Sequence, residues 1–195
     1  MVSELKLDKK VFIQTEETPN PSTLKFTPGV PVMGTGTAAF AKKEDCANSP
    51  LAQKLFECEQ VRGVFLGSDF ITVTKTDDLE WGVLKTEILA IIMDHFVSGG
   101  EVIIKDKTDE KNQPKADDSE VVVQIKELLE ERVRPAVAMD GGDIIFHKYE
   151  DGVVYLEMHG ACAGCPSSGI TLKNGVENML KHFIPEISRV EAIEE

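Results

Sequence analysis

The sequence is poor in basic residues and has no long apolar run. Its 21 Lys and Arg residues stand against 34 Asp and Glu residues, which gives a net charge of -13 at pH 7. Nucleic acids and anionic membrane surfaces are bound by clustered positive charge, so this composition argues against both as partners. The longest apolar stretch, residues 88–97, is interrupted by Asp94 and His95 and is too short to span a bilayer.

The first ten residues show no targeting signal. Met1 to Lys10 lacks the apolar core of a secretory signal and the Arg-rich, acid-poor character of a transit peptide. We therefore expect a soluble intracellular protein. The compartment would be the cytoplasm of a bacterium, or the mitochondrial matrix if this is a eukaryotic chain whose transit peptide has been removed.

Cysteine is scarce, with four residues in the chain. In a reducing compartment so few cysteines do not predict a disulfide framework. Cys46 and Cys58 are isolated, whereas Cys162 and Cys165 form a Cys-Ala-Gly-Cys motif. We expect the chemistry of the protein at this pair, and we expect Cys46 and Cys58 to be ordinary structural residues.

A charged stretch divides the chain into two parts. Residues 105–118 contain one aliphatic side chain, Ala116, and many charges, so nothing in the stretch can be buried to offset the entropy of ordering. This composition predicts a flexible linker between a first domain, residues 1–104, and a second domain, residues 119–195. Both are predicted to be small α+β domains.

The first domain shows strand and helix patterns in alternation. Two strands and a hairpin carry the β-branched and aromatic residues typical of sheets, and Ser49-Pro50 is a helix start. A longer helix has apolar residues at helical spacing and stops at Gly99-Gly100. The predicted elements are strands 11–15 and 23–27, a helix from 50, hairpin strands 61–66 and 70–75, helix 79–97, and a last strand 101–104.

The second domain is predicted to have the order α-β-β-α-β. Its first helix begins near Ser119 and is expected to end before Pro135. Asp140-Gly-Gly-Asp143 is interpreted as a turn rather than a phosphate loop, because no phosphate-loop Lys follows it. The remaining predicted elements are hairpin strands 144–149 and 153–158, a helix from Pro166 to Pro185, and a strand 187–193.

The cysteine pair lies where a predicted strand ends and a helix begins. Backbone N–H groups in the first turn of a helix lack intrahelical partners, and the helix dipole there favours negative charge. We therefore expect a lowered thiol pKa and two thiolates that can hold a metal or an anionic cluster. Gly160 and Gly164 would allow a bulky inorganic group to approach the backbone.

The motif supplies two ligands, whereas a tetrahedral zinc site or a cubane cluster takes four. A second copy of the chain could supply the other two around a two-fold axis, which favours a homodimer that shares one exchangeable cluster. The residues alone leave two alternatives. Cys162 and Cys165 could act as a dithiol oxidoreductase motif, or as half of a structural zinc site that bridges an adaptor dimer.

Two groups of sequence runs, one in each predicted domain, resemble the NifU-like (Nfu) family. Residues 133–143, 156–168 and 171–175 are similar to its C-terminal NifU-like domain, and residues 11–26 and 67–75 are similar to its N-terminal domain. The resemblance implies an iron–sulfur cluster carrier or scaffold, not a turnover enzyme, that binds a [4Fe-4S] cluster at a dimer interface, with [2Fe-2S] as the alternative. Cys162 and Cys165 would be the ligands. An upstream scaffold would be the donor, and apo iron–sulfur proteins would be the acceptors.

Overall fold

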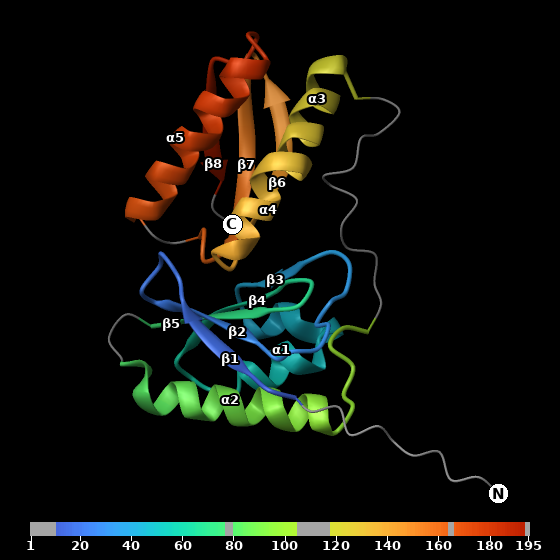
Figure 1. Ribbon diagram of the computed structural model, residues 1–195, viewed down its shortest axis with the longest axis vertical. Coiled ribbons are helices and arrows are strands. Elements are labelled where there is room, and N and C mark those ends of the chain that lie inside the picture. Colours follow the sequence, from blue (N-terminus) through green and yellow to red (C-terminus); the bar gives the residue numbers. More distant parts are fainter. Residues whose placement is uncertain (1–10, 77–79, 105–117, 164–165, 194–195) are drawn as a thin grey trace, which may run out of the picture.

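The chain folds into two lobes that lie one above the other in the computed structural model (Figure 1). The structure describes residues 11–76, 80–104, 118–163 and 166–193. We call residues 11–104 the N lobe and residues 118–193 the C lobe. Each lobe has its own sheet and its own hydrophobic core, so the predicted α+β fold class is confirmed.

The N lobe is a five-stranded antiparallel sheet with the strand order β1-β2-β5-β4-β3. Two α-helices cover one face of this sheet, on the side away from the C lobe (Figure 1). The Ser49 hydroxyl caps the first helix by accepting a hydrogen bond from the Ala52 N–H, as the sequence predicts. The elements are β1 (Gln14–Glu17), β2 (Thr23–Thr27), β3 (Ala38–Phe40), a 3₁₀ turn (Lys43–Asn48), α1 (Pro50–Leu55), β4 (Val61–Leu66), β5 (Ile71–Lys75) and α2 (Trp81–Val97).

The C lobe is a three-stranded sheet with the order β6-β7-β8. Strands β6 and β7 form an antiparallel hairpin, whereas β8 runs parallel to β7 after a crossover through α5. The helices pack on one face of this sheet. The order of the elements along the chain is the predicted α-β-β-α-β. The elements are α3 (Glu120–Leu128), a π-helical turn (Leu129–Val133), α4 (Arg134–Met139), β6 (Gly142–Glu150), β7 (Val153–Gly160), α5 (Pro166–Phe183) and β8 (Arg189–Ile193).

The structure differs from the prediction in several elements, and β1 begins at Gln14 rather than at residue 11. Residues 101–104 do not form a strand, and β3 was not predicted. The first helix of the C lobe does not end before Pro135 but continues to Met139. The π-helical turn explains this continuation, because the Arg134 N–H already bonds to the carbonyl of Leu129, and Pro135 therefore sits at the start of a new helical segment, where its missing N–H costs little.

The predicted linker falls almost entirely outside the described residues. Its last residue, Asp118, is described, and its carboxylate forms a 2.7 Å ion pair with the buried ammonium of Lys126. Among the helices that the structure describes, none is long and apolar enough to cross a membrane.

Candidate functional site

The cysteine motif lies at the junction between β7 and α5, as predicted. The backbone from Ala161 to Ala163 forms a tight turn in which all three N–H groups are bonded to carbonyls. The Ala161 N–H donates to Gly141, the Cys162 N–H to His159 and the Ala163 N–H to Gly160, over 3.1, 3.3 and 3.1 Å. In this conformation these three donors are therefore not available to a ligand. Cys165 lies outside the described residues.

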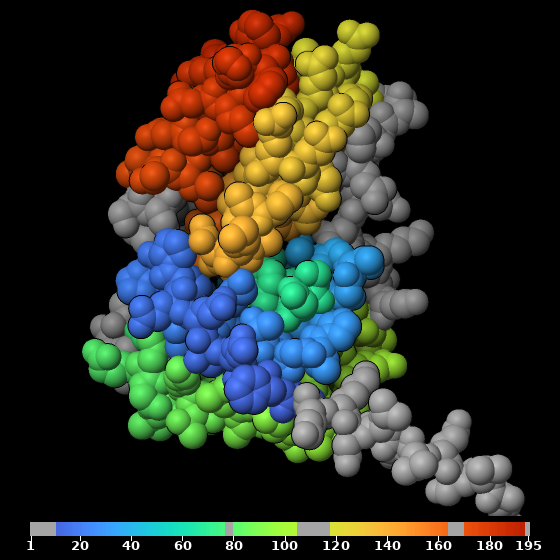
Figure 2. All heavy atoms as spheres, viewed as in Figure 1, coloured from blue at the N-terminus to red at the C-terminus, as the bar shows by residue number. Residues whose placement is uncertain are grey.

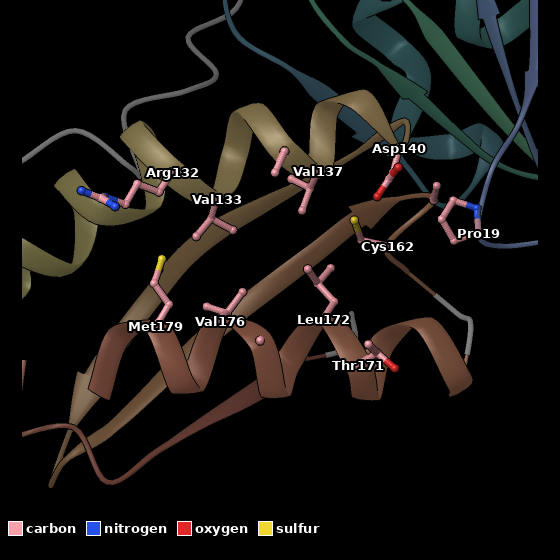
Figure 3. A pocket seen from close by; sticks show the side chains of 13 residues that line it. Pro19, Arg132, Val133, Val137, Asp140, Cys162, Thr171, Leu172, Val176 and Met179 are labelled. Carbon is pink, nitrogen blue, oxygen red and sulfur yellow. The ribbon is translucent and has the colours of Figure 1, made fainter. Parts of the chain in front are cut away.

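The Cys162 side chain is buried, with 6% of its surface exposed, and belongs to the hydrophobic core of the C lobe. Figure 3 shows its sulfur directed into a groove between the α3–α4 helical segment and α5. The groove has a volume of about 670 Å³ and a largely apolar wall. It is lined by Pro19, Arg132, Val133, Ala136, Val137, Asp140, Ala161, Cys162, Thr171, Leu172, Gly175, Val176 and Met179.

The electrostatic surroundings of Cys162 contradict the predicted low thiol pKa. Burial, reinforced by the negative charges of Asp140 and Asp143, raises the pKa of Cys162 to about 12. The prediction was wrong because it considered the start of α5 alone, whereas the sulfur lies in the apolar groove and feels the negative charges of Asp140, at the end of α4, and Asp143, in β6. In this conformation Cys162 is a neutral thiol at pH 7.

A buried ion pair lies beside the cysteine turn. Asp143 accepts two hydrogen bonds from the Arg134 guanidinium, from Nε at 2.8 Å and from Nη2 at 2.7 Å. The Thr37 hydroxyl of the N lobe donates a further 2.9 Å bond to the same carboxylate. The carboxylate raises the pKa of Arg134, which stays charged. The pattern of Asp140-Gly-Gly-Asp143 predicted the turn correctly, but nothing in its spacing indicated this pairing.

Glycines allow the close packing around the turn. Gly142 lies directly against the Cys162 sulfur, where a side chain would collide. Gly160 has a φ of +63°, and a Cβ there would lie 2.6 Å from the carbonyl oxygen of Gly141. Gly160 was expected to make room for an inorganic group, but in this structure it makes room for the protein's own backbone. Gly164 lies outside the described residues.

Cys46 and Cys58 are far from this chemistry, because both lie in the hydrophobic core of the N lobe. The Cys46 thiol donates a 3.3 Å hydrogen bond to the Lys42 carbonyl. Burial raises the pKa of each thiol to about 11. Neither contributes to a shared ligand set with Cys162, which belongs to the other core.

The described part of the C lobe contains a side chain of the right type to bind an iron–sulfur cluster, but fewer such side chains than a cluster requires. Cys162 is a soft sulfur ligand of the kind that iron–sulfur clusters take. Among the residues that the structure describes, no three His, Cys, Asp or Glu side chains are grouped so that they could hold a metal ion. A cluster held by Cys162 would therefore take its other ligands from outside this set.

The two lobes and the buried thiol at the β7–α5 junction define a two-lobed α+β protein with a candidate cysteine site in its C lobe. Two family models match the chain: "Scaffold protein Nfu/NifU N terminal" over residues 13–99 and "NifU-like domain" over residues 125–191. The chain belongs to the Nfu/NifU family of iron–sulfur cluster scaffold proteins and contains both of these domains.

Named relatives agree with this family. The "NFU1 iron-sulfur cluster scaffold homolog, mitochondrial" of Drosophila willistoni is 50% identical over 186 residues, which cover 95% of this chain and 64% of that protein. Its counterpart in Drosophila grimshawi is 52% identical over 183 residues, with 93% and 61% covered. The chain thus spans less than two thirds of the length of these relatives. A solution structure of a NifU-like protein from Saccharomyces cerevisiae is 26% identical, with a TM-score of 0.47, over 54% of this chain and 95% of that one.

Proposed function

We propose that the protein is a carrier of iron–sulfur clusters that holds a labile [4Fe-4S] cluster, with [2Fe-2S] as the alternative form. Cys162 and Cys165 would be its ligands, and a second copy of the chain would supply the other two thiolates. The observation that carries this proposal is the position of the Cys162 turn between β7 and α5, in a chain that belongs to a scaffold family. Two thiolates per chain and four ligands per cluster make the two-fold arrangement the simplest one.

The proposed transfer is an exchange of thiolate ligands. A thiolate of the acceptor forms a bond to an iron of the cluster as the bond from Cys162 to that iron breaks, and the proton lost by the acceptor thiol passes to Cys162 directly or through water. The departing side chain then returns to the buried position in the groove, where it packs with Val137 and Leu172 (Figure 3). The apo iron–sulfur proteins would be acceptors, and an upstream scaffold would be the donor. The word mitochondrial in the names of the relatives supports the mitochondrion as the compartment, and within it we propose the matrix.

The family supports this carrier over a dithiol oxidoreductase, and the described conformation does not present a reactive redox thiol. Nucleophilic cysteines of redox motifs have a lowered pKa and are partly exposed. Cys162 has neither property in the described conformation, because it is 6% exposed and its pKa is raised. The second alternative is an adaptor dimer in which the cysteines of two copies bind a structural zinc ion. This adaptor would contain zinc, whereas the carrier would contain iron and sulfide.

The test is the content of iron, acid-labile sulfide and zinc per chain after anaerobic reconstitution, measured together with the mass of the complex. A carrier should hold about two irons and two sulfides per chain in a dimer. Cys162→Ser and Cys165→Ser should each abolish retention while the far-ultraviolet circular dichroism stays unchanged. Zinc without sulfide would indicate the adaptor, and a reversible Cys162–Cys165 disulfide without metal would indicate the oxidoreductase.

A further inference from the structure

The N-lobe sheet is buried on both of its faces. Val64, Leu66, Ile71 and Val73 point toward α1 and α2 and belong to the N-lobe core. By strand alternation, Phe65 and Thr72 point the other way, yet they are only 2% and 1% exposed. The C lobe covers this second face. Strand β7 contacts β4 and β5, and in Figure 2 the atoms at the end of α4 lie against those of the N lobe.

The contacts on this face are made by the backbone that surrounds Cys162. A Cβ on Gly160 would lie 3.1 Å from the ring of Phe65, and a Cβ on Gly141 would lie 2.8 Å from the methyl group of Thr72. Lys25 donates a 2.9 Å hydrogen bond to the carbonyl of Met139, at the end of α4. The N lobe therefore rests on both chain segments that form the cysteine turn, the α4–β6 connection and the end of β7.

The turn between β1 and β2 extends this contact to the motif itself. Asn20 is 5% exposed, and its side-chain amide donates a 3.0 Å hydrogen bond to the carbonyl of Ala163, the residue after Cys162. Its neighbour Pro19 lines the groove that holds the Cys162 sulfur (Figure 3).

Hydrogen bonds within the N lobe hold the β1–β2 turn in shape. The Asn20 side-chain oxygen accepts from the Ser22 N–H at 3.0 Å, and the Thr18 hydroxyl donates to the Asn20 carbonyl at 2.8 Å. The indole N–H of Trp81 donates a 3.1 Å bond to the Pro21 carbonyl from the outside of the turn. These bonds present the Asn20 amide in a fixed direction, so little entropy is lost when it meets Ala163.

We propose that the N lobe masks the cysteine turn in a closed, cluster-free state, and that the lobes must separate before Cys162 can bind a cluster shared with a second chain. The inference rests on the proposed function. A thiol that is 6% exposed, in a groove whose wall includes Pro19 of its own N lobe, cannot reach an iron that another chain also ligates. In this proposal a second cysteine turn approaches the side of the turn that Asn20 and Pro19 cover. The N lobe and the partner chain thus compete for the same surface of the cysteine turn.

The first test is the alkylation rate of Cys162 in the apo chain, resolved by residue with tandem mass spectrometry. Asn20→Asp keeps the oxygen that accepts from Ser22 but removes the donor to Ala163, and Thr37→Val removes the bond to Asp143. In the double variant Cys162 should react at least about fivefold faster, the shift expected from the loss of one hydrogen bond of ordinary strength. Gln14→Glu adds the same charge on an exposed position of β1 and should leave the rate unchanged.

Cys46 and Cys58 report within the same experiment whether the N lobe stays folded, because they become reactive only if its core opens. If they react faster in the double variant, the Thr37→Val single variant replaces it. An unchanged Cys162 rate in a variant whose Cys46 and Cys58 stay protected would overturn the proposal. This measurement needs no cluster, so it remains decisive even if the chain binds none.

The second test is hydrogen–deuterium exchange of the wild-type chain before and after cluster loading. Separation of the lobes predicts faster exchange of the β1–β2 turn, residues 18–22, in the loaded form, because this turn loses its bond to Ala163, whereas the paired strands β4 and β5 should keep their protection. Unchanged protection of this turn in a chain whose iron and sulfide content proves loading would contradict the masking role while leaving the carrier function intact.

Discussion

The sulfur of Cys162 rests against the backbone of Gly142, with no room for a side chain between them. Both residues lie at the open end of the β6–β7 hairpin, where Gly142 begins β6 and pairs with Gly160, two residues before Cys162. The hairpin therefore determines how far the cysteine can withdraw into the C lobe.

Gly142→Ala is expected to push the Cys162 side chain out of its place and to lower the free energy of unfolding by about 1–3 kcal/mol, the usual cost of overpacking a core. Urea denaturation of the reduced apo protein measures this change. Gly175→Ala is the matched control, because Gly175 lies in α5 with open space around it. There the same substitution should stabilise the helix by up to about 1 kcal/mol. Equal effects of the two substitutions would contradict the close packing.

Arg134→Leu is expected to destabilise the protein by about 3 kcal/mol, because it leaves the carboxylate of Asp143 buried without its charged partner. The comparison is Arg189→Leu. Arg189 is exposed and pairs with Glu191 at 3.4 Å on the surface, where an ion pair is worth less than about 1 kcal/mol. Chemical denaturation of both variants provides the measurement, and a loss at Arg134 no larger than that at Arg189 would argue against the buried pair.

The stability of the protein should depend on His95 below neutral pH. This side chain is 2% exposed, and its Nε2 has no hydrogen-bond partner among the described residues. Burial, aided by the positive charge of Lys54, lowers the pKa of His95. In the unfolded chain the pKa lies near its ordinary value of about 6.5, so the unfolded state binds more protons and stability falls as the pH drops below that value.

The pH dependence is measured as the urea midpoint between pH 7.5 and pH 5. His95→Gln should flatten this dependence, since the group that titrates differently in the two states is gone. His182→Gln, at an exposed position of α5, should retain the wild-type slope. Identical slopes for the two variants would show that another group is responsible.

Replacement of both N-lobe cysteines by alanine should not change cluster loading. Cys46 and Cys58 belong to a different core from Cys162, so Cys46→Ala/Cys58→Ala should cost about 1 kcal/mol of stability per site and retain the wild-type iron and sulfide content. Cys162→Ala is the opposite case, with loss of loading expected. Iron and sulfide analysis after reconstitution measures the loading. Reduced loading in the N-lobe double variant would indicate that Cys46 or Cys58 is a ligand.

Local patterns predicted most of the fold. The caps at Ser49 and Ser119, the β4–β5 hairpin and the start of α5 at Pro166 all occur where short-range rules place them. The missed strand β3 is three residues long and follows a Gly- and Thr-rich stretch without alternation, so its pairing with β4 is decided by the sheet rather than by its own residues. The helix continues through Pro135 because of the π-helical turn before it, and no sequence pattern predicts such a turn.

The motif could be found from the sequence, but its surroundings could not. The spacing of Cys162 and Cys165 and their place between strand and helix are local properties. Three features of the surroundings depend on tertiary packing, and no sequence pattern predicts them. They are the burial of Cys162, the pairing of Arg134 with Asp143 and the hydrogen bond from Asn20 to Ala163. The last of these spans 143 positions. The error in the thiol pKa has the same origin, because it depends on carboxylates and apolar side chains brought in by tertiary packing.

The bond from Asn20 to Ala163 lies within one chain, so lobe closure does not depend on how much protein is present. Association with a second copy does depend on it, because two molecules must meet. If both events compete for the cysteine turn, dilution favours the closed form, and abundance favours the shared cluster. The fraction of chains that share a cluster would then rise with the protein concentration, and the strength of lobe closure would set the concentration at which dimers form.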